Sequence, residues 1–124
     1  MKKKLRLGMI GGGQGAFIGA VHRLSARMDD KYEFVAACLS STPEKAVASA
    51  NEIGLNLDRS YPDYTTMASE ESKREDGIEV VSIVTPNHMH AGPAIQFLQK
   101  DIHVICDKPM TATMDDAHNL ISVI

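Results

Sequence analysis

Residues suited to binding a phosphorylated ligand lie near the start of the chain. Glycine occupies positions 11, 12, 13 and 15, directly after an apolar run over residues 5–10. Because glycine has no Cβ, such a turn lets a ligand approach the backbone and leaves N–H groups open at the start of the following helix. Helical spacing of apolar residues begins at Phe17. We therefore expect this turn to hold a diphosphate.

A second candidate for chemistry is Lys108, which follows an apolar run over residues 102–106. It lies between Asp107 and Pro109, and the restricted backbone of the proline should hold its ammonium group in one direction. A lysine held in this way can orient a substrate hydroxyl or exchange a proton with it. Taken alone, Lys108 is better interpreted as a surface lysine in a turn.

Two further polar segments follow apolar runs over residues 33–39 and 78–84, and these are Ser40-Ser41 and Thr85-Pro86-Asn87. Apolar runs alternate with helical patterns, which predicts one α/β domain over residues 1–124 with a doubly wound parallel sheet, a Rossmann fold. Ligands of such sheets bind at the carboxyl ends of the strands. We therefore expect all four candidate segments to lie along one edge of the sheet.

Start and stop signals place most of the helices. Thr42 and Pro43 begin a helix that Gly54 ends, and residues 91–99 have helical apolar spacing. Thr113, with Asp116 three residues later, resembles a capping box that opens the last helix. Over residues 56–76 the signals are weaker. Residues 61–63 indicate a turn or a short edge strand, and residues 64–73 indicate a polar helix.

Composition limits the classes of protein to consider. The chain has 124 residues, 44% of them hydrophobic, which is enough for one buried core. A net charge of -3 and a short basic segment at residues 2–6 predict no nucleic-acid partner. No apolar run is long enough to span a membrane, so we expect a cytoplasmic protein. Cys38 and Cys106 lie in apolar runs and are interpreted as buried, reduced thiols.

The five histidines do not form an obvious metal site. His88 and His90 are close in sequence, but no carboxylate or thiolate stands at a matching spacing, so no metal is expected. The other three are interpreted as an ordinary helix residue, a strand-entry residue and a surface residue: His22, His103 and His118.

The spacing Gly11-x-Gly13-x-x-Ala16 matches the fingerprint of dinucleotide-binding proteins and lies in the required strand-turn-helix context. In NAD-binding proteins the second strand usually ends in an acid that binds the adenosine ribose, whereas here Ser40 and Ser41 follow it. Hydroxyl groups and Lys45 could instead hold a 2′-phosphate, so the cofactor is expected to be NAD(P), with NADP favoured. Thr42 is interpreted as a helix cap.

Three segments together, IGGGQGAFIGAVHR, VVSIVTPNHMH and HVICDKPM, resemble the N-terminal cofactor domain of the glucose-fructose oxidoreductase, inositol dehydrogenase and rhizopine catabolism (Gfo/Idh/MocA) family. The resemblance covers essentially the whole chain. It implies hydride transfer between a nicotinamide and a hydroxyl or keto carbon of a sugar, an inositol or a related polyol.

The resemblance also implies roles for individual residues. Lys108 corresponds to the family's catalytic lysine, which contacts substrate, although Asp107 stands where the family has glutamate. The cofactor-binding residues follow in two groups. The pyrophosphate turn maps to Gly11, Gly13, Gln14, Gly15, Ala16, Phe17 and Ile18, and the nicotinamide side to Thr85, Pro86, Asn87 and His90.

Members of that family carry a second, open-faced sheet domain that supplies a partner histidine, much of the sugar site and often the oligomer contacts. That domain is absent from this chain, whose last helix reaches Ile124 without a stop signal. We therefore expect a fragment of a longer, homo-oligomeric two-domain enzyme. Alone, it is expected to bind the dinucleotide weakly and to be inactive.

Two other functions fit part of the sequence. A non-catalytic dinucleotide-binding module would keep the glycine turn without needing Lys108. An S-adenosylmethionine-dependent methyltransferase also has a glycine turn after its first strand. It would usually need an acid after the second strand, where this chain has Ser40.

Overall fold

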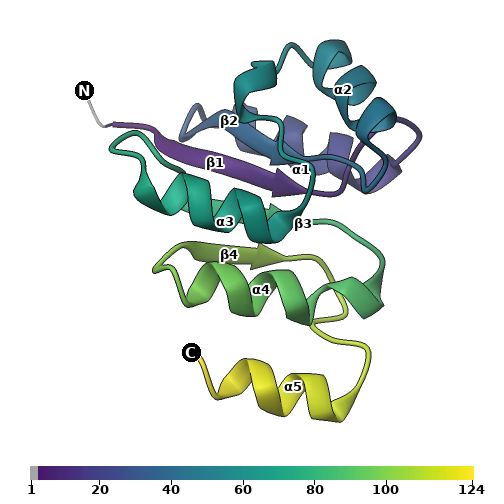
Figure 1. Ribbon diagram of the computed structural model, residues 1–124, viewed down its shortest axis with the longest axis vertical. Coiled ribbons are helices and arrows are strands. Elements are labelled where there is room, and N and C mark those ends of the chain that lie inside the picture. Colours follow the sequence, from purple (N-terminus) through teal and green to yellow (C-terminus); the bar gives the residue numbers. More distant parts are fainter. Residues whose placement is uncertain (1–2) are drawn as a thin grey trace.

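Four apolar runs form one parallel sheet in the computed structural model, which describes residues 3–124. The strands are β1 (Leu5–Ile10), β2 (Tyr32–Cys38), β3 (Val80–Ile83) and β4 (His103–Cys106), in the order β2-β1-β3-β4. All strand pairs are parallel, and the strand arrowheads that can be seen in Figure 1 point the same way. After β1 the chain continues to β2 on one side of it, whereas β3 and β4 lie on the other side. The strand order thus reverses between β1 and β3, and a ligand crevice is expected at the carboxyl ends of these two strands.

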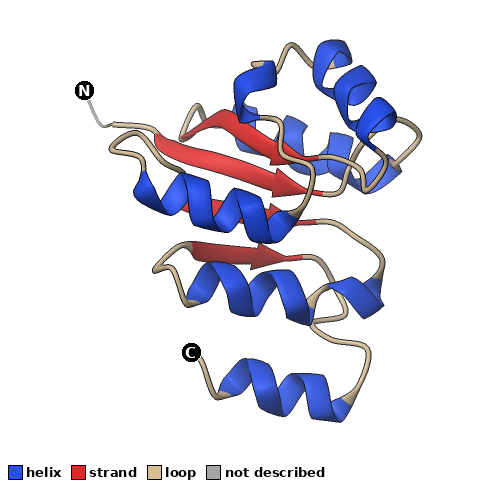
Figure 2. Cartoon of the chain, in the orientation of Figure 1, coloured by secondary structure: helices blue, strands red, loops and turns tan. Residues whose placement is uncertain are grey.

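Helices cover both faces of this sheet (Figure 2). In Figure 1, α3 (Tyr64–Lys73) and α4 (Ala91–Leu98) lie in front of the sheet, and α1 (Phe17–Met28) lies behind it. The remaining elements are α2 (Pro43–Glu52), α5 (Met114–Ile121) and the short 3-10 helices η1 (Leu57–Arg59) and η2 (Asn87–Met89). The doubly wound α/β fold expected from the sequence is confirmed.

Two hydrophobic cores hold the layers together, one on each face. Met9 packs with residues of β2 and α2, and Ile18 of α1 joins this cluster. The neighbouring residue Ile10 packs on the opposite face, in a larger cluster that includes Phe97 of α4 and Leu120 of α5. Adjacent residues of one strand are therefore buried on opposite faces, as expected for a central parallel strand.

The structure corrects some of the predicted boundaries. The third strand was expected over residues 78–84 but forms only over Val80–Ile83, and the N–H of Ile78 donates instead to Glu71 Oε1 at 3.1 Å. Beside β2, Ser60 forms an isolated parallel bridge to Ala37, immediately before the segment predicted as a turn or edge strand.

The predicted helix starts are confirmed, with one difference in how they are capped. Asp116 N donates to Thr113 Oγ1 at 3.1 Å, as the capping box requires. Thr42 is the N-cap of α2 and Pro43 follows it, but the Thr42 side chain makes no capping hydrogen bond. The N–H of Thr42 itself donates to Ser40 Oγ at 3.1 Å.

Both cysteines are free thiols. Cys38 is buried, and this burial raises the pKa of its thiol to about 11. Cys106 is only half-buried, and burial raises its pKa as well. Met1 and Lys2, where the basic segment begins, lie outside the described residues.

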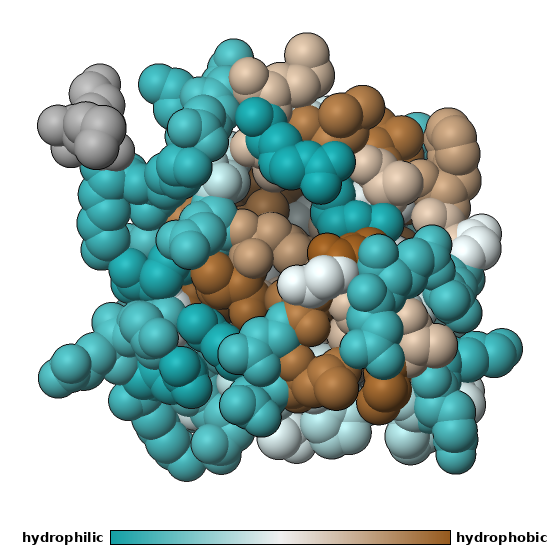
Figure 3. Space-filling view, turned by 90° about the horizontal axis from the view of Figure 1, so that it is seen from above, coloured by the Kyte–Doolittle hydropathy of each residue, from teal (hydrophilic) through white to brown (hydrophobic). Residues whose placement is uncertain are grey.

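Some apolar side chains remain open to solvent. The elements α2 and η1 form the top of Figure 1, and from that end apolar surface is visible in the middle of a polar periphery (Figure 3). Val47 of α2 and Leu57 of η1 are each about half exposed. Within residues 3–124, no helix has the length and apolar character needed to cross a membrane.

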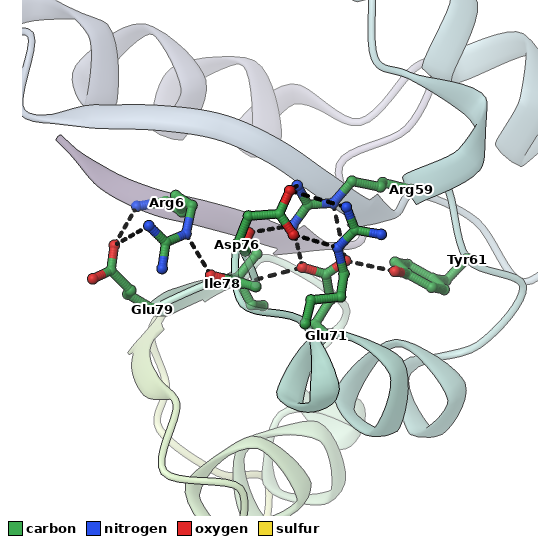
Figure 4. Close-up of polar contacts among 9 residues, drawn as sticks. Arg6, Arg59, Tyr61, Glu71, Asp76, Ile78 and Glu79 are labelled. Carbon is green, nitrogen blue, oxygen red and sulfur yellow. Dashed lines mark hydrogen bonds and ion pairs between the residues drawn. The ribbon is translucent and has the colours of Figure 1, made fainter.

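A buried ionic network joins elements that precede β3 in the chain (Figure 4). The Glu71 side chain is fully buried and accepts hydrogen bonds from the Arg59 guanidinium, the Tyr61 hydroxyl and the Ile78 N–H. Arg59 also donates to the carbonyl oxygen of Asp76 at 3.0 Å. Burial, together with the hydrogen bond to Glu71, raises the pKa of Tyr61 above its usual value. One carboxylate thus joins η1, α3 and the start of β3.

Replacing Glu71 with leucine should leave the Arg59 charge and the Tyr61 hydroxyl buried without their acceptor. We expect the free energy of unfolding to fall by about 3–5 kcal/mol, as measured by urea denaturation. Glu70→Leu is the matched control, because Glu70 lies on the same helix but is exposed, and its ion pair is with Lys73 at 3.9 Å. Its effect should stay within about 0.5 kcal/mol. Equal losses in the two variants would contradict a stabilising role for the network.

Candidate functional site

Backbone hydrogen bonds bring the ends of the strands to one edge of the sheet. Gly11 N donates to Cys38 O at 2.8 Å, Val84 N to Ile10 O at 3.0 Å, and Asp107 N to Ile83 O at 3.0 Å. The segments that follow β1, β2, β3 and β4 therefore all begin at the carboxyl edge. The loops that follow the arrowheads lie on the right in Figure 2. This edge is the candidate site.

The glycine loop makes two backbone contacts that leave no room for a side chain. A Cβ on Gly13 would lie 2.6 Å from the carbonyl oxygen of Leu39, at the end of β2. A Cβ on Gly19, in α1, would lie 2.5 Å from Gly12 Cα. The loop is therefore pressed between the end of β2 and the first turns of α1. Gly19 brings helix and loop together, a contact that the sequence pattern did not identify.

The start of α1 is suited to binding an anion. Its N-cap is Ala16, whose side chain cannot accept a capping hydrogen bond, and its first turn has no acidic residue. The first N–H groups of a helix need acceptors from outside the helix, and phosphate oxygens can supply them. Phe17 at the same end is 81% exposed. The glycine loop and the start of α1 thus form a surface that fits a pyrophosphate.

Neighbouring helices brace the glycine loop from behind. Gln14 N donates to Ser49 Oγ at 2.9 Å, and Gln14 Nε2 donates to Glu52 Oε2 at 2.7 Å. Arg23 Nη1 donates to Gly12 O at 2.9 Å. The side chain of Gln14, a predicted cofactor-binding residue, is thus directed at α2. Any contribution it makes to binding comes through the position of the loop.

The residues predicted to meet the adenosine ribose lie beyond the end of β2. Ser41 and Lys45 are exposed, and Ser40 is half-buried, with its Oγ accepting from Thr42 N. The segment between Leu39 and Pro43 has hydroxyl groups and no carboxylate. Its chemistry suits a ribose or a phosphate.

The loop after β3 contacts the glycine loop. A Cβ on Gly11 would lie 3.0 Å from Thr85 Cγ2, so the loops that follow the paired strands β1 and β3 are in contact. Thr85 Oγ1 donates to Met89 O at 3.0 Å, while Pro86 and Asn87 are exposed. Pro86 and Asn87 are thus open to a ligand at the expected crevice.

His90 lies beneath this loop and not on its surface. It is 1% exposed, with Nε2 2.8 Å from Thr85 O and Nδ1 2.6 Å from Pro109 O. The imidazole therefore joins the loop after β3 to the loop after β4. Because both ring nitrogens face backbone oxygens, His90 can affect a bound cofactor through these loops and not by a direct polar contact.

Lys108 is exposed and follows the end of β4 by two residues. Within residues 3–124, its amine has no carboxylate near enough for an ion pair, although Asp107 precedes it. His90 holds the turn on the far side, through Pro109 O. Lys108 is thus an exposed residue of the same carboxyl edge that the glycine loop begins from.

Sequence reasoning missed one residue near this turn. His22, interpreted as an ordinary helix residue, has Nδ1 2.7 Å from Ser82 Oγ and Nε2 3.7 Å from Asp107 Oδ1. Its spacing was an available signal, since it lies three residues after Gly19 and so on the same face of α1. Gly19 contacts the glycine loop, and the face that they share is directed at the sheet.

Comparisons with known proteins agree with this geometry. The model of the oxidoreductase family with an NAD-binding Rossmann fold (GFO_IDH_MocA) matches residues 5–124. A crystal structure of an oxidoreductase from Sinorhizobium meliloti is 58% identical, with a TM-score of 0.95, over 98% of this chain and 34% of that one. An inositol dehydrogenase homolog from Azotobacter vinelandii, crystallised with NAD+, is 34% identical, with a TM-score of 0.92, over 98% of this chain and 31% of that one.

A curated relative, the uncharacterized oxidoreductase YfiI of Bacillus subtilis, is 37% identical over 121 residues, which is 97% of this chain and 31% of the relative. The chain thus spans about a third of the length of the proteins it matches. The match covers every strand and helix of the candidate site. The chain belongs to the Gfo/Idh/MocA family of oxidoreductases, as its NAD-binding Rossmann domain.

Proposed function

We propose that this chain is the cofactor-binding half of a longer two-domain dehydrogenase. The enzyme would transfer hydride between NAD(P) and a hydroxyl or keto carbon of a sugar, an inositol or a related polyol. The observation that carries the proposal is the exposed amine of Lys108, at the carboxyl edge of a nucleotide-binding sheet. Its turn is tied through His90 to the Thr85 loop, which in turn touches Gly11.

The residues present fit a dinucleotide along this edge. The glycine loop and the uncapped start of α1 would hold the pyrophosphate, since its oxygens supply acceptors that the helix lacks. Ser40, Ser41 and Lys45 would face the adenosine ribose, and Thr85, Pro86 and Asn87 the nicotinamide. When bound, the nicotinamide supplies the hydride acceptor or donor.

In the proposed reaction, Lys108 exchanges a proton with the substrate hydroxyl. Oxidation of an alcohol to a ketone removes a hydride from carbon and a proton from oxygen, so a group at the oxygen is needed. Lys108 is suited to this task because its amine is exposed and not paired with a carboxylate among residues 3–124. The non-catalytic module is the remaining alternative, because a family of oxidoreductases argues against the methyltransferase.

We further propose that, of the two forms of NAD(P), NADP is favoured over NAD. The support is chemical: hydroxyl groups and an ammonium follow β2, where an acid would repel a 2′-phosphate. The NAD+ bound to the Azotobacter vinelandii homolog favours the opposite choice for that protein. The sugar or polyol substrate, the homo-oligomer and the cytoplasmic location stay predictions.

Lys108→Met keeps the length of the side chain and removes its amine. In the full-length enzyme we expect turnover to fall by about 10²–10⁴-fold, because a positioned proton-transfer group is lost. The dissociation constant of the cofactor, followed by nicotinamide fluorescence, should stay within about twofold. Lys100→Met, at an exposed lysine beyond α4, is the control and should change neither. Unchanged turnover in Lys108→Met would favour the non-catalytic module, and equal loss of turnover and cofactor affinity would mean that Lys108 serves binding alone.

Lys45→Gln tests the cofactor preference. If Lys45 holds a 2′-phosphate, the dissociation constant for NADPH should rise by about tenfold while that for NADH stays the same, because only NADPH loses a charged contact. Lys31→Gln, at an exposed lysine that precedes β2, is the matched control. Tighter binding of NADH than of NADPH by the unaltered protein would sink the NADP proposal.

A further inference from the structure

We infer that His22, held by Ser82, is a positioning residue for Lys108, and this inference rests on the proposed role of that lysine. Three polar side chains from separate elements meet behind the Lys108 turn. Ser82 lies on β3 and is 2% exposed, His22 lies on α1, and Asp107 follows β4. His22 lies between the other two, with Nδ1 2.7 Å from Ser82 Oγ and Nε2 3.7 Å from Asp107 Oδ1.

The contact with Ser82 fixes which nitrogen of His22 faces the carboxylate. When the imidazole is neutral with its proton on Nε2, the hydroxyl of Ser82 can donate to Nδ1. When the imidazole is protonated, Nδ1 donates to the same hydroxyl oxygen. In both of these states Nε2 carries a proton and faces Asp107 Oδ1, but at 3.7 Å the contact is too long for a hydrogen bond and acts through charge. Ser82 thus holds the ring with Nε2 towards Asp107, and the attraction to the carboxylate is strongest when the ring is protonated.

Holding Asp107 affects Lys108 because the two residues are adjacent. The backbone of Asp107 is fixed to β3 through its N–H and Ile83 O, and His22 attracts its carboxylate. On the other side of Lys108, Pro109 O lies 2.6 Å from His90 Nδ1. Both neighbours of Lys108 are therefore held by a histidine from a different helical segment. The direction in which the lysine leaves the backbone is set by these contacts.

A second effect follows from charge. A carboxylate released from His22 would be free to pair with the ammonium group of the next residue. Such a pair would draw Lys108 towards Asp107 and away from a substrate hydroxyl. With His22 in place, the Asp107 carboxylate lies towards α1, and the lysine has no such partner among residues 3–124.

The test is a set of variants in the full-length enzyme. His22→Ala should lower kcat by about tenfold or more, because small displacements of a catalytic group are costly. KM for the cofactor should stay within about twofold. His22→Gln, whose amide can still donate to Asp107, should restore kcat to within about threefold of the unaltered enzyme. Ser25→Ala, at an exposed residue one turn later on α1, is the control and should leave kcat unchanged.

A double variant separates positioning from a general loss of structure. If His22 acts through Lys108, adding His22→Ala to Lys108→Met should lower kcat no further, because the group it positions is already gone. Additive losses, a failure of glutamine to rescue, or an unchanged kcat in His22→Ala would each overturn the inference.

One further variant, together with Lys108→Met, distinguishes failure of the inference from misfolding and from failure of the proposed function. Asp107→Asn keeps the size of the side chain and removes the charge that attracts His22. A drop in kcat is expected even if the alanine variant folds poorly, and it should be smaller than that of His22→Ala because asparagine cannot pair with the Lys108 ammonium group. If Asp107→Asn leaves kcat unchanged, the carboxylate is not part of the arrangement, and the inference is wrong. If Lys108→Met itself keeps full turnover, the proposed function fails first and the inference fails with it.

Discussion

Close backbone packing around the glycine loop sets the geometry of the whole carboxyl edge. The loop passes against Leu39 at the end of β2, against the first turns of α1, and against Thr85 at the end of β3. A side chain at Gly13 would need to occupy the place of a carbonyl oxygen, so the loop has little freedom to move away. This contact fixes where α1 begins. It therefore fixes where an anion can bind and where His22 meets the sheet.

Two of the five histidines connect separate segments of the chain near the carboxyl edge. His90 joins the segments after β3 and β4 from below, and His22 joins α1 to β3 and to the residue before Lys108. Each connection uses both ring nitrogens, which lets one side chain contact two segments at once. The catalytic candidate is thus supported by residues that need not touch the substrate.

The sequence was sufficient for the fold and for part of the site. Apolar runs alternating with helical spacing predicted the parallel sheet, because strands buried on both faces need such runs. The segments of the carboxyl edge followed from topology alone. The contacts of His22 with Asp107 and of Glu71 with Arg59 could not be predicted, since they join residues far apart in the sequence. Only the packing of α1 and α3 on the sheet decides these contacts.

The Glu71 network lies where β3 begins, away from the glycine loop at the other end of the strands. The ionic cluster and the expected ligand edge therefore lie at opposite ends of β3. Substitutions at exposed positions of the carboxyl edge, such as Ser41 or Asn87, leave this ionic cluster untouched, whereas the glycine loop is constrained by its own backbone contacts. A domain arranged in this way can change what it binds over evolutionary time while its scaffold persists.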